Sequence, residues 1–228
     1  MDTQSPKVGQ IERKTQNRIV ALFRDRLHYD YLGNWEDRDG NSNIEEELLK
    51  NNLKARRYSD TLIDKAIFEL TRVATNQIQS LYDLNESIYS MLRYGVKVKE
   101  GIGEQTETVW LIDWLNPLAN QFAIAEEVTV KGQKTKRPDI VIYVNGIAIG
   151  VIELKRSIVS VSEGIRQNIG NQKNEYIKNF FTTIQVLMAG NDTEGMRYGT
   201  IETPEEYYLT WKEKGLDEKK IEKILTFT

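Results

Sequence analysis

The sequence from Lys136 to Arg156, KRPDIVIYVNGIAIGVIELKR, is the stretch around which the rest of the chain is organised. Two apolar runs rich in β-branched residues flank Asn145-Gly146, a dipeptide typical of a tight hairpin turn. Asp139 precedes the first run, and Glu153 and Lys155 end the second. Because successive strand residues face opposite sides, Glu153 and Lys155 share a face. Buried charge requires a partner or a metal ion, so this hairpin end is a candidate chemical site.

The composition is that of a soluble globular protein of 228 residues, with 39% hydrophobic and 29% charged residues and a net charge of −3. There is no cysteine, which excludes disulfides and thiolate metal sites. The first residues lack the apolar core of an export signal, and no apolar run approaches the roughly 20 residues of a membrane span, so we expect a cytoplasmic protein. His28 is the only histidine. Carboxylate, lysine or tyrosine chemistry therefore remains.

Hydrophobic periodicity predicts an α/β fold: a mixed central β-sheet flanked by helices, with a helical N-terminal section. We expect residues 1–93 to form that helical section, residues 94–200 the core, and residues 201–228 a C-terminal helical segment. Patterns typical of helices occupy residues 11–27, 44–53, 60–73, 76–92, 161–179, 205–214 and 217–225. Strand patterns occupy residues 96–98, 106–112, 121–130, 140–144, 147–152 and 181–189, and residues 190–199 are expected to form a loop.

The charges at the hairpin end suit a metal site. Two neighbouring carboxylates, Asp139 and Glu153, raise each other's pKa unless a divalent cation neutralises them. Magnesium binds one or two carboxylates together with waters and phosphate oxygens, and the Leu154 carbonyl is a further candidate ligand. Lys155 would position an attacking water or stabilise developing charge, so the group suits phosphodiester hydrolysis. The alternative is a solvated hairpin end with a surface ion pair.

The hairpin register decides whether one ion can be shared. A strict two-residue turn would pair Asp139 with Ile152 and place Glu153 on the opposite face. A three-residue loop, Val144–Gly146 with Gly146 left-handed in a bulge, would pair Asp139 with Val151. Asp139 and Glu153 would then be diagonal neighbours on one face, about 7–8 Å apart. We therefore predict the three-residue loop or an equivalent bulge.

A resemblance rests on residues that span most of the chain after residue 100. These are Leu111–Pro117, Gln121, Phe122, Arg137–Asp139, Val144–Gly146, Ile152–Lys155, Ile165–Gln167, Ala189–Asn191 and Arg197–Gly199. The stretch RPDIVIYVNG followed by GVIELKR resembles the PD-(D/E)xK nuclease motif. The chain as a whole resembles the N-terminal nuclease domain of the restriction (R) subunit of type I restriction enzymes.

The resemblance implies a Mg²⁺-dependent endonuclease that cuts double-stranded DNA. Asp139 and Glu153 would be metal ligands and Lys155 the water-positioning residue. Such R subunits continue into an ATP-driven motor and assemble with modification (methyltransferase) and specificity subunits. This chain has no Gly-Lys-Ser/Thr phosphate-binding motif. It therefore resembles the nuclease section alone, with residues 201–228 leading toward the motor.

Nuclease domains of this type often add a glutamine and a tyrosine four residues apart on the following helix. Gln172 and Tyr176 have that spacing and would share a helix face. Gln167 is better placed by its distance from Glu153, although its partner four residues on is Asn171, and both choices remain open. Such domains also often use an acid from the first helix, for which Glu12 is the candidate. The position that aligns best holds Gln16 or Asn17.

Basic residues beside the motif are expected to contact the DNA backbone, which positions a protein without reading sequence. Two other interpretations remain open. One is a DNA repair or methyl-directed nuclease with the same core. The other is a noncatalytic docking module in which the hairpin charges are structural. The expected DNA-contacting residues are Lys131, Lys134, Lys136, Arg137, Arg156 and Arg166.

Overall fold

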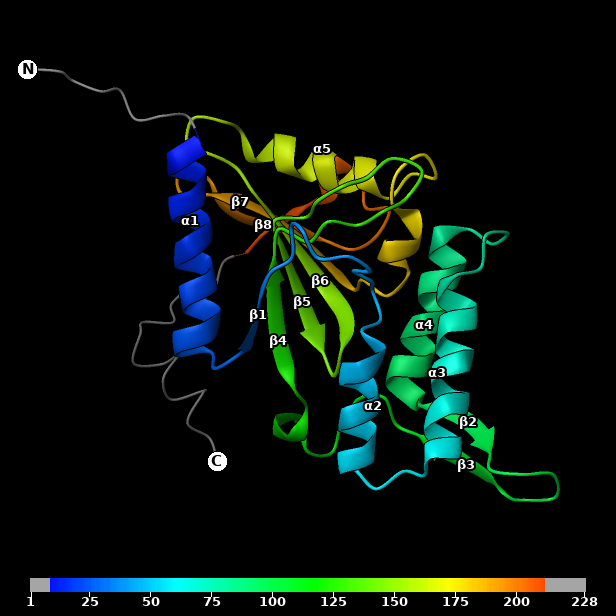
Figure 1. Ribbon diagram of the computed structural model, residues 1–228. Helices are drawn as coiled ribbons and strands as arrows, with labels where there is room; N and C mark the ends of the chain where they lie inside the picture. The colour runs from blue at the N-terminus through cyan, green and yellow to red at the C-terminus, as the bar shows by residue number, and fades with distance from the viewer. Residues whose placement is uncertain (1–8, 212–228) are drawn as a thin grey trace, which may run out of the picture.

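The computed structural model describes residues 9–211, with side chains from Arg13 onward. Its centre is a seven-stranded sheet in the order β1-β4-β5-β6-β7-β8-β9 (Figure 1). β1 pairs with β4 in parallel, as β6 does with β7, and the other neighbours are antiparallel, so the sheet is mixed. The expected α/β class is confirmed. The strands are β1 (Asp30–Asn34), β4 (Phe122–Glu126), β5 (Ile140–Val144), β6 (Ile147–Leu154), β7 (Val186–Asn191), β8 (Gly195–Gly199) and β9 (Leu209–Thr210).

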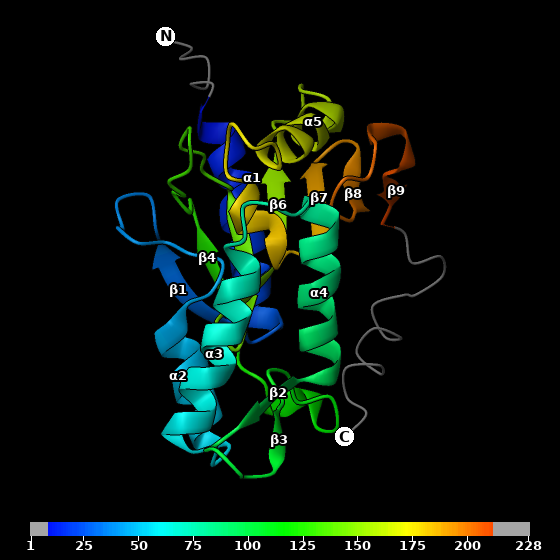
Figure 2. The ribbon, with the colours of Figure 1, turned by 90° about the vertical axis from the view of Figure 1, so that its right-hand side faces the viewer.

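Helices flank the sheet on both sides. In Figure 1, α1 lies along one side and α3 and α4 along the other, and Figure 2 shows α5 above the ends of β6 and β7. A separate antiparallel pair, β2 and β3, packs at the end of the helical layer. The bounds are α1 (Gly9–Ala21), α2 (Glu46–Ala55), α3 (Asp60–Ala74), α4 (Leu81–Tyr94), α5 (Val161–Asn171), β2 (Val96–Lys99) and β3 (Thr106–Val109). Short helical turns cover Leu22–Arg26, Pro117–Ala119, Lys178–Thr182 and Glu205–Tyr207.

The helices begin where the sequence offers capping residues. The hydroxyl oxygens of Ser59, Ser80 and Ser160 accept backbone N–H groups at the starts of α3, α4 and α5. Each bond satisfies one of the donors that a helix leaves free at its start. No helix within residues 9–211 combines the length and the apolar character needed to cross a membrane.

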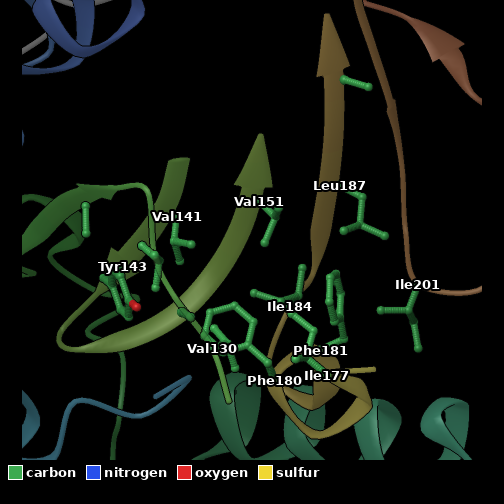
Figure 3. Close-up of a cluster of buried hydrophobic side chains, with 14 of the residues drawn as sticks. Val130, Val141, Tyr143, Val151, Ile177, Phe180, Phe181, Ile184, Leu187 and Ile201 are labelled. Atoms are coloured by element: carbon green, nitrogen blue, oxygen red, sulfur yellow. The ribbon is translucent and has the colours of Figure 1, made fainter. Parts of the chain in front are cut away.

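The two faces of the sheet bury different apolar clusters. Val151 of β6 belongs to the cluster in Figure 3, which includes Phe181 and the first residues of α5. Ile152, its neighbour, belongs to a cluster on the opposite face with Val20 of α1. Because side chains alternate along a strand, Glu153 lies on the Val151 face and points toward α5. The hydrophobic pattern of β6 thus sets the direction of this carboxylate.

The β5–β6 hairpin has a two-residue turn and a bulge. Val144 pairs with Ile147, and the residues between them, Asn145 (φ 51°) and Gly146 (φ 82°), are both left-handed, as a type I′ turn requires. The predicted three-residue loop is therefore wrong, because the Asn-Gly pair meets the geometry of the shorter turn. The register then shifts, with Ile149 as the extra residue in β6. This is the equivalent bulge that we predicted.

The bulge changes which residues lie opposite each other. On the side of the bulge away from the turn, Ile140 pairs with Ile152. Asp139 therefore lies opposite Glu153 rather than diagonal to it. One inserted residue reverses the face of everything beyond it, because the side-chain period is two. Asp139 and Glu153 therefore share the α5 face, which an unbulged two-residue hairpin would not allow.

Asn145 holds the hairpin turn against the loop before β4. Its side-chain N–H groups donate to Leu111 O and Asn120 Oδ1, and its Oδ1 accepts the Gln121 N–H, each at 2.8 Å. We expect Asn145→Ala to lower the free energy of unfolding by about 3 kcal/mol. The buried hydrogen bonds of the side chain are lost, and alanine adopts the left-handed conformation of this position less readily than asparagine does. Urea denaturation measures the change.

Asn145→Gly separates the two causes, because glycine adopts the left-handed conformation without strain. We expect this variant to be intermediate between the wild type and Asn145→Ala. A loss below about 1 kcal/mol in the alanine variant would contradict the structural role.

The structure corrects four expectations after residue 160. α5 ends at Asn171 rather than near residue 179, because Ile177 and Phe180 turn into the core. For the same reason the apolar run at 181–189 divides into a 3-10 helix and β7. The expected loop at 190–199 contains β8, which pairs with β7. The expected helix at 205–214 is a 3-10 turn followed by β9, and residues 212–228, including the second terminal helix, lie outside the described residues.

Candidate active site

β6 passes beneath α5 (Figure 2), and the residues at its end bring Glu153 and Lys155 beside Asp139. Gln167 of α5 joins two of them: its Nε2 donates to Glu153 Oε2, and its Oε1 accepts from Lys155 Nζ, both at 2.7 Å. Contact with one glutamine places Glu153 and Lys155 on the same face, as the strand period predicted. The carboxamide fixes the separation of an acidic and a basic group.

Asp139 is half-buried just before β5, and its Oδ2 accepts the Leu154 N–H at 2.6 Å. The next peptide of β6 points the other way, because the Lys155 N–H donates to Gly190 O of β7. In a strand the N–H and C=O of one residue point to the same side. The Leu154 carbonyl therefore faces the Asp139 side, where a role as metal ligand stays a prediction.

Glu153 is fully buried, and its Oε1 has no hydrogen-bond partner among the described residues. Burial raises the pKa of this carboxyl well above its ordinary value, and the negative charge of Asp139 raises it further, against the opposing effect of Lys155. A buried acceptor without a partner is costly unless a proton or cation joins it. The Oε1 atom is therefore able to accept a proton or a cation.

The site contains two carboxylates, those of Asp139 and Glu153, that could bind a cation. Nowhere in the described part of the chain do three or more acidic or histidine side chains gather as a metal-binding group. Asp139 and Glu153 lie opposite each other on one face, and the orphaned Glu153 oxygen remains available. Mg²⁺ binds one or two carboxylates and fills its other positions with water and phosphate oxygens. These residues therefore fit Mg²⁺ better than an ion that needs an all-protein cage.

Only one of the two glutamine choices contacts the carboxylate. Gln167 reaches Glu153 and Lys155, whereas Gln172 is buried and structural. Gln172 donates to Asn168 O at 3.0 Å and accepts the Glu202 N–H at 2.6 Å. The predicted shared helix face of Gln172 and Tyr176 is wrong, because α5 ends before both residues. Tyr176 instead lies beside the loop between β4 and β5, on which Lys136 is placed.

α1 also reaches the site. The side chain of Glu12 lies outside the described residues, so its predicted role stays a prediction. Gln16, one of the two residues at the aligned position, is buried and donates to Glu126 Oε2 at 3.2 Å and to Asp139 O at 3.4 Å. Asn17, the other, is exposed. Gln16 thereby links the first helix to the backbone of Asp139.

Glu126 at the end of β4 is the site residue that the sequence reasoning missed. It is 4% exposed and accepts hydrogen bonds from Arg13 at 3.0 Å, from Gln16 and from the Tyr31 hydroxyl at 2.8 Å. A signal was present, because an acid that ends an apolar strand resembles the placement of Glu153. The three donors, however, come from α1 and β1, which lie far from it in sequence.

Five of the six expected DNA-contacting residues fall into two groups. Lys131 pairs with Asp39 at 2.6 Å, and Arg137 and Arg166 each have carboxylate partners at 2.9 and 2.8 Å. Lys134 and Lys136 form no salt bridge with any described residue and lie over the ring of Tyr176. Arg156 is half-buried directly after Lys155. Exposed ion pairs are weak, so the paired residues stay available to other anions.

Comparison with known proteins places the chain in a family. Residues 9–206 match the model of the type I restriction enzyme R protein N terminus. A putative type I restriction enzyme MjaIXP endonuclease subunit of Methanocaldococcus jannaschii is 26% identical over 174 residues, which are 72% of this chain and 17% of that protein. The type I restriction enzyme HindI endonuclease subunit of Haemophilus influenzae is 28% identical over 163 residues, 69% of this chain and 15% of that protein.

A second archaeal relative, the putative type I restriction enzyme MjaVIIIP endonuclease subunit of Methanocaldococcus jannaschii, is 33% identical over 136 residues. That match covers 58% of this chain and 12% of the relative. The chain thus spans less than a fifth of the length of these curated relatives. By its match over nearly all of the described residues, the chain belongs to the family of type I restriction enzyme R protein N termini.

Proposed function

We propose that this chain is the Mg²⁺-dependent endonuclease section of a type I restriction enzyme and hydrolyses phosphodiester bonds of double-stranded DNA. The observation that carries the proposal is the buried Glu153 carboxylate. One of its oxygens has no hydrogen-bond partner in the described structure, and it lies opposite Asp139 with Lys155 on the same face. Family membership supports the same conclusion. The arrangement agrees with a PD-(D/E)xK site.

The residues have separate tasks in this proposal. Asp139 and Glu153 would hold Mg²⁺, with the Leu154 carbonyl as a further ligand. When bound, the ion would polarise the phosphate and make a coordinated water more acidic. Lys155 would donate hydrogen bonds to the attacking water and to the charged phosphate oxygens. Gln167 would hold Lys155 and Glu153 at a constant separation through its two 2.7 Å bonds.

The wider proposal concerns the complete enzyme. The chain spans at most 17% of the curated relatives described above, so a complete subunit would carry the ATP-dependent motor elsewhere. It would act in the cytoplasm with modification (methyltransferase) and specificity subunits. Cleavage would depend on that assembly, which is why activity is best measured in the complete complex.

Lys155→Ala in the complete complex tests the proposed function. We expect DNA cleavage to fall at least about 100-fold, because a charge that stabilises the transition state is removed. Assembly and DNA binding should persist, because Lys155 lies at the edge of the core. The assay follows linearisation of a plasmid that carries the recognition sequence.

Lys99→Ala is the matched control, since Lys99 is exposed on β2 and outside the central sheet. Cleavage by Lys155→Ala at the wild-type rate would mean that the hairpin charges are structural, as in a noncatalytic docking module. Loss of cleavage in both variants would point to a general effect of charge.

A further inference from the structure

A polar cleft of about 590 Å³ is lined in part by the loop that leads from β4 to Asp139. Its walls come from the loop between β4 and β5, the end of α3 and the segment that follows α5. This volume is typical of pockets for small ligands, about 300–1,000 Å³. None of the described residues that line the cleft is acidic, although the protein is net negative. The polar groups that line it include Gln77, Lys131, Gln133, Asn174, Tyr176 and Lys178.

Two lysines that have no ion-pair partner among residues 13–211 lie at the edge of this cleft. Lys136 Nζ lies 4.1 Å from the centre of the Tyr176 ring, and Lys134 Nζ lies 5.3 Å from it. A cation–π contact stabilises each ammonium by only about 0.5–1 kcal/mol, and the two positive charges repel each other. Neither has a salt bridge within the described chain, unlike Lys131 and Arg137. An anion between them would relieve the repulsion.

The cleft and the candidate active site share their supporting segments. The loop that carries Lys134 and Lys136 leads directly into Asp139, and the segment with Tyr176 follows the helix that carries Gln167. The Gln133 N–H donates to Tyr176 O at 3.2 Å and joins the two segments. Gly132 allows this approach, because a Cβ there would lie 2.1 Å from Tyr176 O. A polynucleotide strand at Asp139 would therefore meet the lysines and then the cleft.

The side chains in the cleft suit unpaired nucleotides. Gln77, Gln133 and Asn174 make no side-chain hydrogen bond with other described residues. Carboxamides pair well with the edges of bases, which a duplex shields except in its grooves. A positively charged groove with an aromatic side chain is the usual surface for single-stranded nucleic acid. A cleft of small-ligand size accepts one or two nucleotides, whereas a duplex would only rest across its opening.

We propose that this cleft binds a single-stranded segment of DNA. A phosphodiester lies between Lys134 and Lys136, and the adjoining nucleotide enters the amide-lined space. The identity of the polynucleotide as DNA rests on the proposed function. The cleft would hold a strand that has separated from its complement next to the site of cleavage.

Binding measured without divalent metal tests this inference. The 228-residue chain is titrated in EDTA against a fluorescent single strand of about 12 nucleotides and against a blunt duplex of the same length, by anisotropy. We expect the single strand to bind more tightly than the duplex. In Lys134→Ala/Lys136→Ala the Kd for the single strand should rise about tenfold, and the salt slope should fall by about 0.7, since the one phosphate held between the two lysines contributes about that amount.

The control is Lys97→Ala/Lys99→Ala, which removes two exposed lysines at the same spacing from β2. It should change the Kd for the single strand less than about twofold, because salt screens the attraction between the DNA and exposed charges outside the cleft. Gln77→Ala/Asn174→Ala should weaken single-strand binding without changing the salt slope, because it removes no charge.

Tighter binding of the blunt duplex, or equal effects of the two lysine pairs, would overturn the inference. Failure of the proposed function has a different signature: Lys155→Ala would then cleave DNA normally, whatever the cleft binds. Conversely, if the cleft variants bind the single strand as the wild type does while Lys155→Ala abolishes cleavage, the cleft inference fails and the proposed function stands.

Discussion

An Asp139→Asn variant is expected to lose DNA cleavage by at least about 100-fold and to lose divalent-metal binding at the hairpin. The substitution changes one proposed ligand from anionic to neutral without changing its shape. The amide oxygen can still accept the Leu154 N–H, a bond that spans 2.6 Å in the wild type. The fold should therefore remain, so the loss would report on charge rather than on unfolding.

Calorimetric titration with Mn²⁺ or Ca²⁺ measures metal binding, and plasmid cleavage by the complete complex measures activity. Asp64→Asn is the matched control, because Asp64 is exposed on α3 and pairs only with Lys50 at 3.4 Å among the described residues. An Asp139→Asn variant that binds Mn²⁺ as the wild type does would refute the role of Asp139 as a ligand. Full cleavage by that variant would refute the catalytic assignment as well.

Glu153→Gln is expected to stabilise the metal-free protein by about 1–3 kcal/mol near pH 8 while it abolishes cleavage. Glu153 is fully buried, and one carboxylate oxygen has no described partner. A glutamine keeps an oxygen for the Gln167 N–H, removes the repulsion with Asp139 and adds a donor. In the proposed metal site, the charge that would bind a cation would therefore lower the stability of the metal-free protein.

The pH dependence has a definite sign. Burial and Asp139 raise the pKa of Glu153 in the folded protein above its ordinary value of 4.5, so the folded state retains the proton to higher pH. Below about pH 4.5 the side chain is neutral in both states, and wild type and variant should have similar stability. As the pH rises through the folded pKa, the wild type should lose stability relative to Glu153→Gln. Urea denaturation in EDTA from pH 4.5 to 8.5 measures this difference.

Mg²⁺ should reverse the order of stability. Binding to the folded wild type stabilises it as the ion concentration exceeds Kd, whereas Glu153→Gln should respond little. Glu206→Gln, an exposed position, should follow the wild type in every condition. A Glu153→Gln variant that is less stable than the wild type at pH 8 in EDTA would contradict the account of a strained, buried carboxylate.

Much of the candidate site was predictable because local rules set it. The alternation of a strand places Glu153 and Lys155 on one face, and apolar runs on either side of Asn145-Gly146 indicate the buried hairpin. The helices expected to begin at residues 60 and 161 do begin there, after the capping residues Ser59 and Ser160. Each of these features depends only on residues that are close together in sequence. For that reason each could be predicted from its own short segment.

Other features depended on how distant segments pack. The short turn at Asn145-Gly146 would have separated the carboxylates, and the bulge at Ile149 corrects the register where β6 pairs with β5. The choice of Gln167 over Gln172 follows from the end of α5, which is decided by the burial of Ile177. The ion pairs of Lys131 and Arg166 also join segments that lie far apart in the chain.

The sequence by itself determined the chemical identity of the site: two carboxylates and a lysine at the end of an apolar hairpin. These groups follow from residue type and strand period, which need no knowledge of the rest of the fold. Only the tertiary structure decided that Asp139 lies opposite Glu153, that Gln167 spans Glu153 and Lys155, and that Gln16 of α1 joins Glu126 of β4 to the backbone of Asp139. Those contacts arise from long-range burial and register, which act through residues that no local pattern connects.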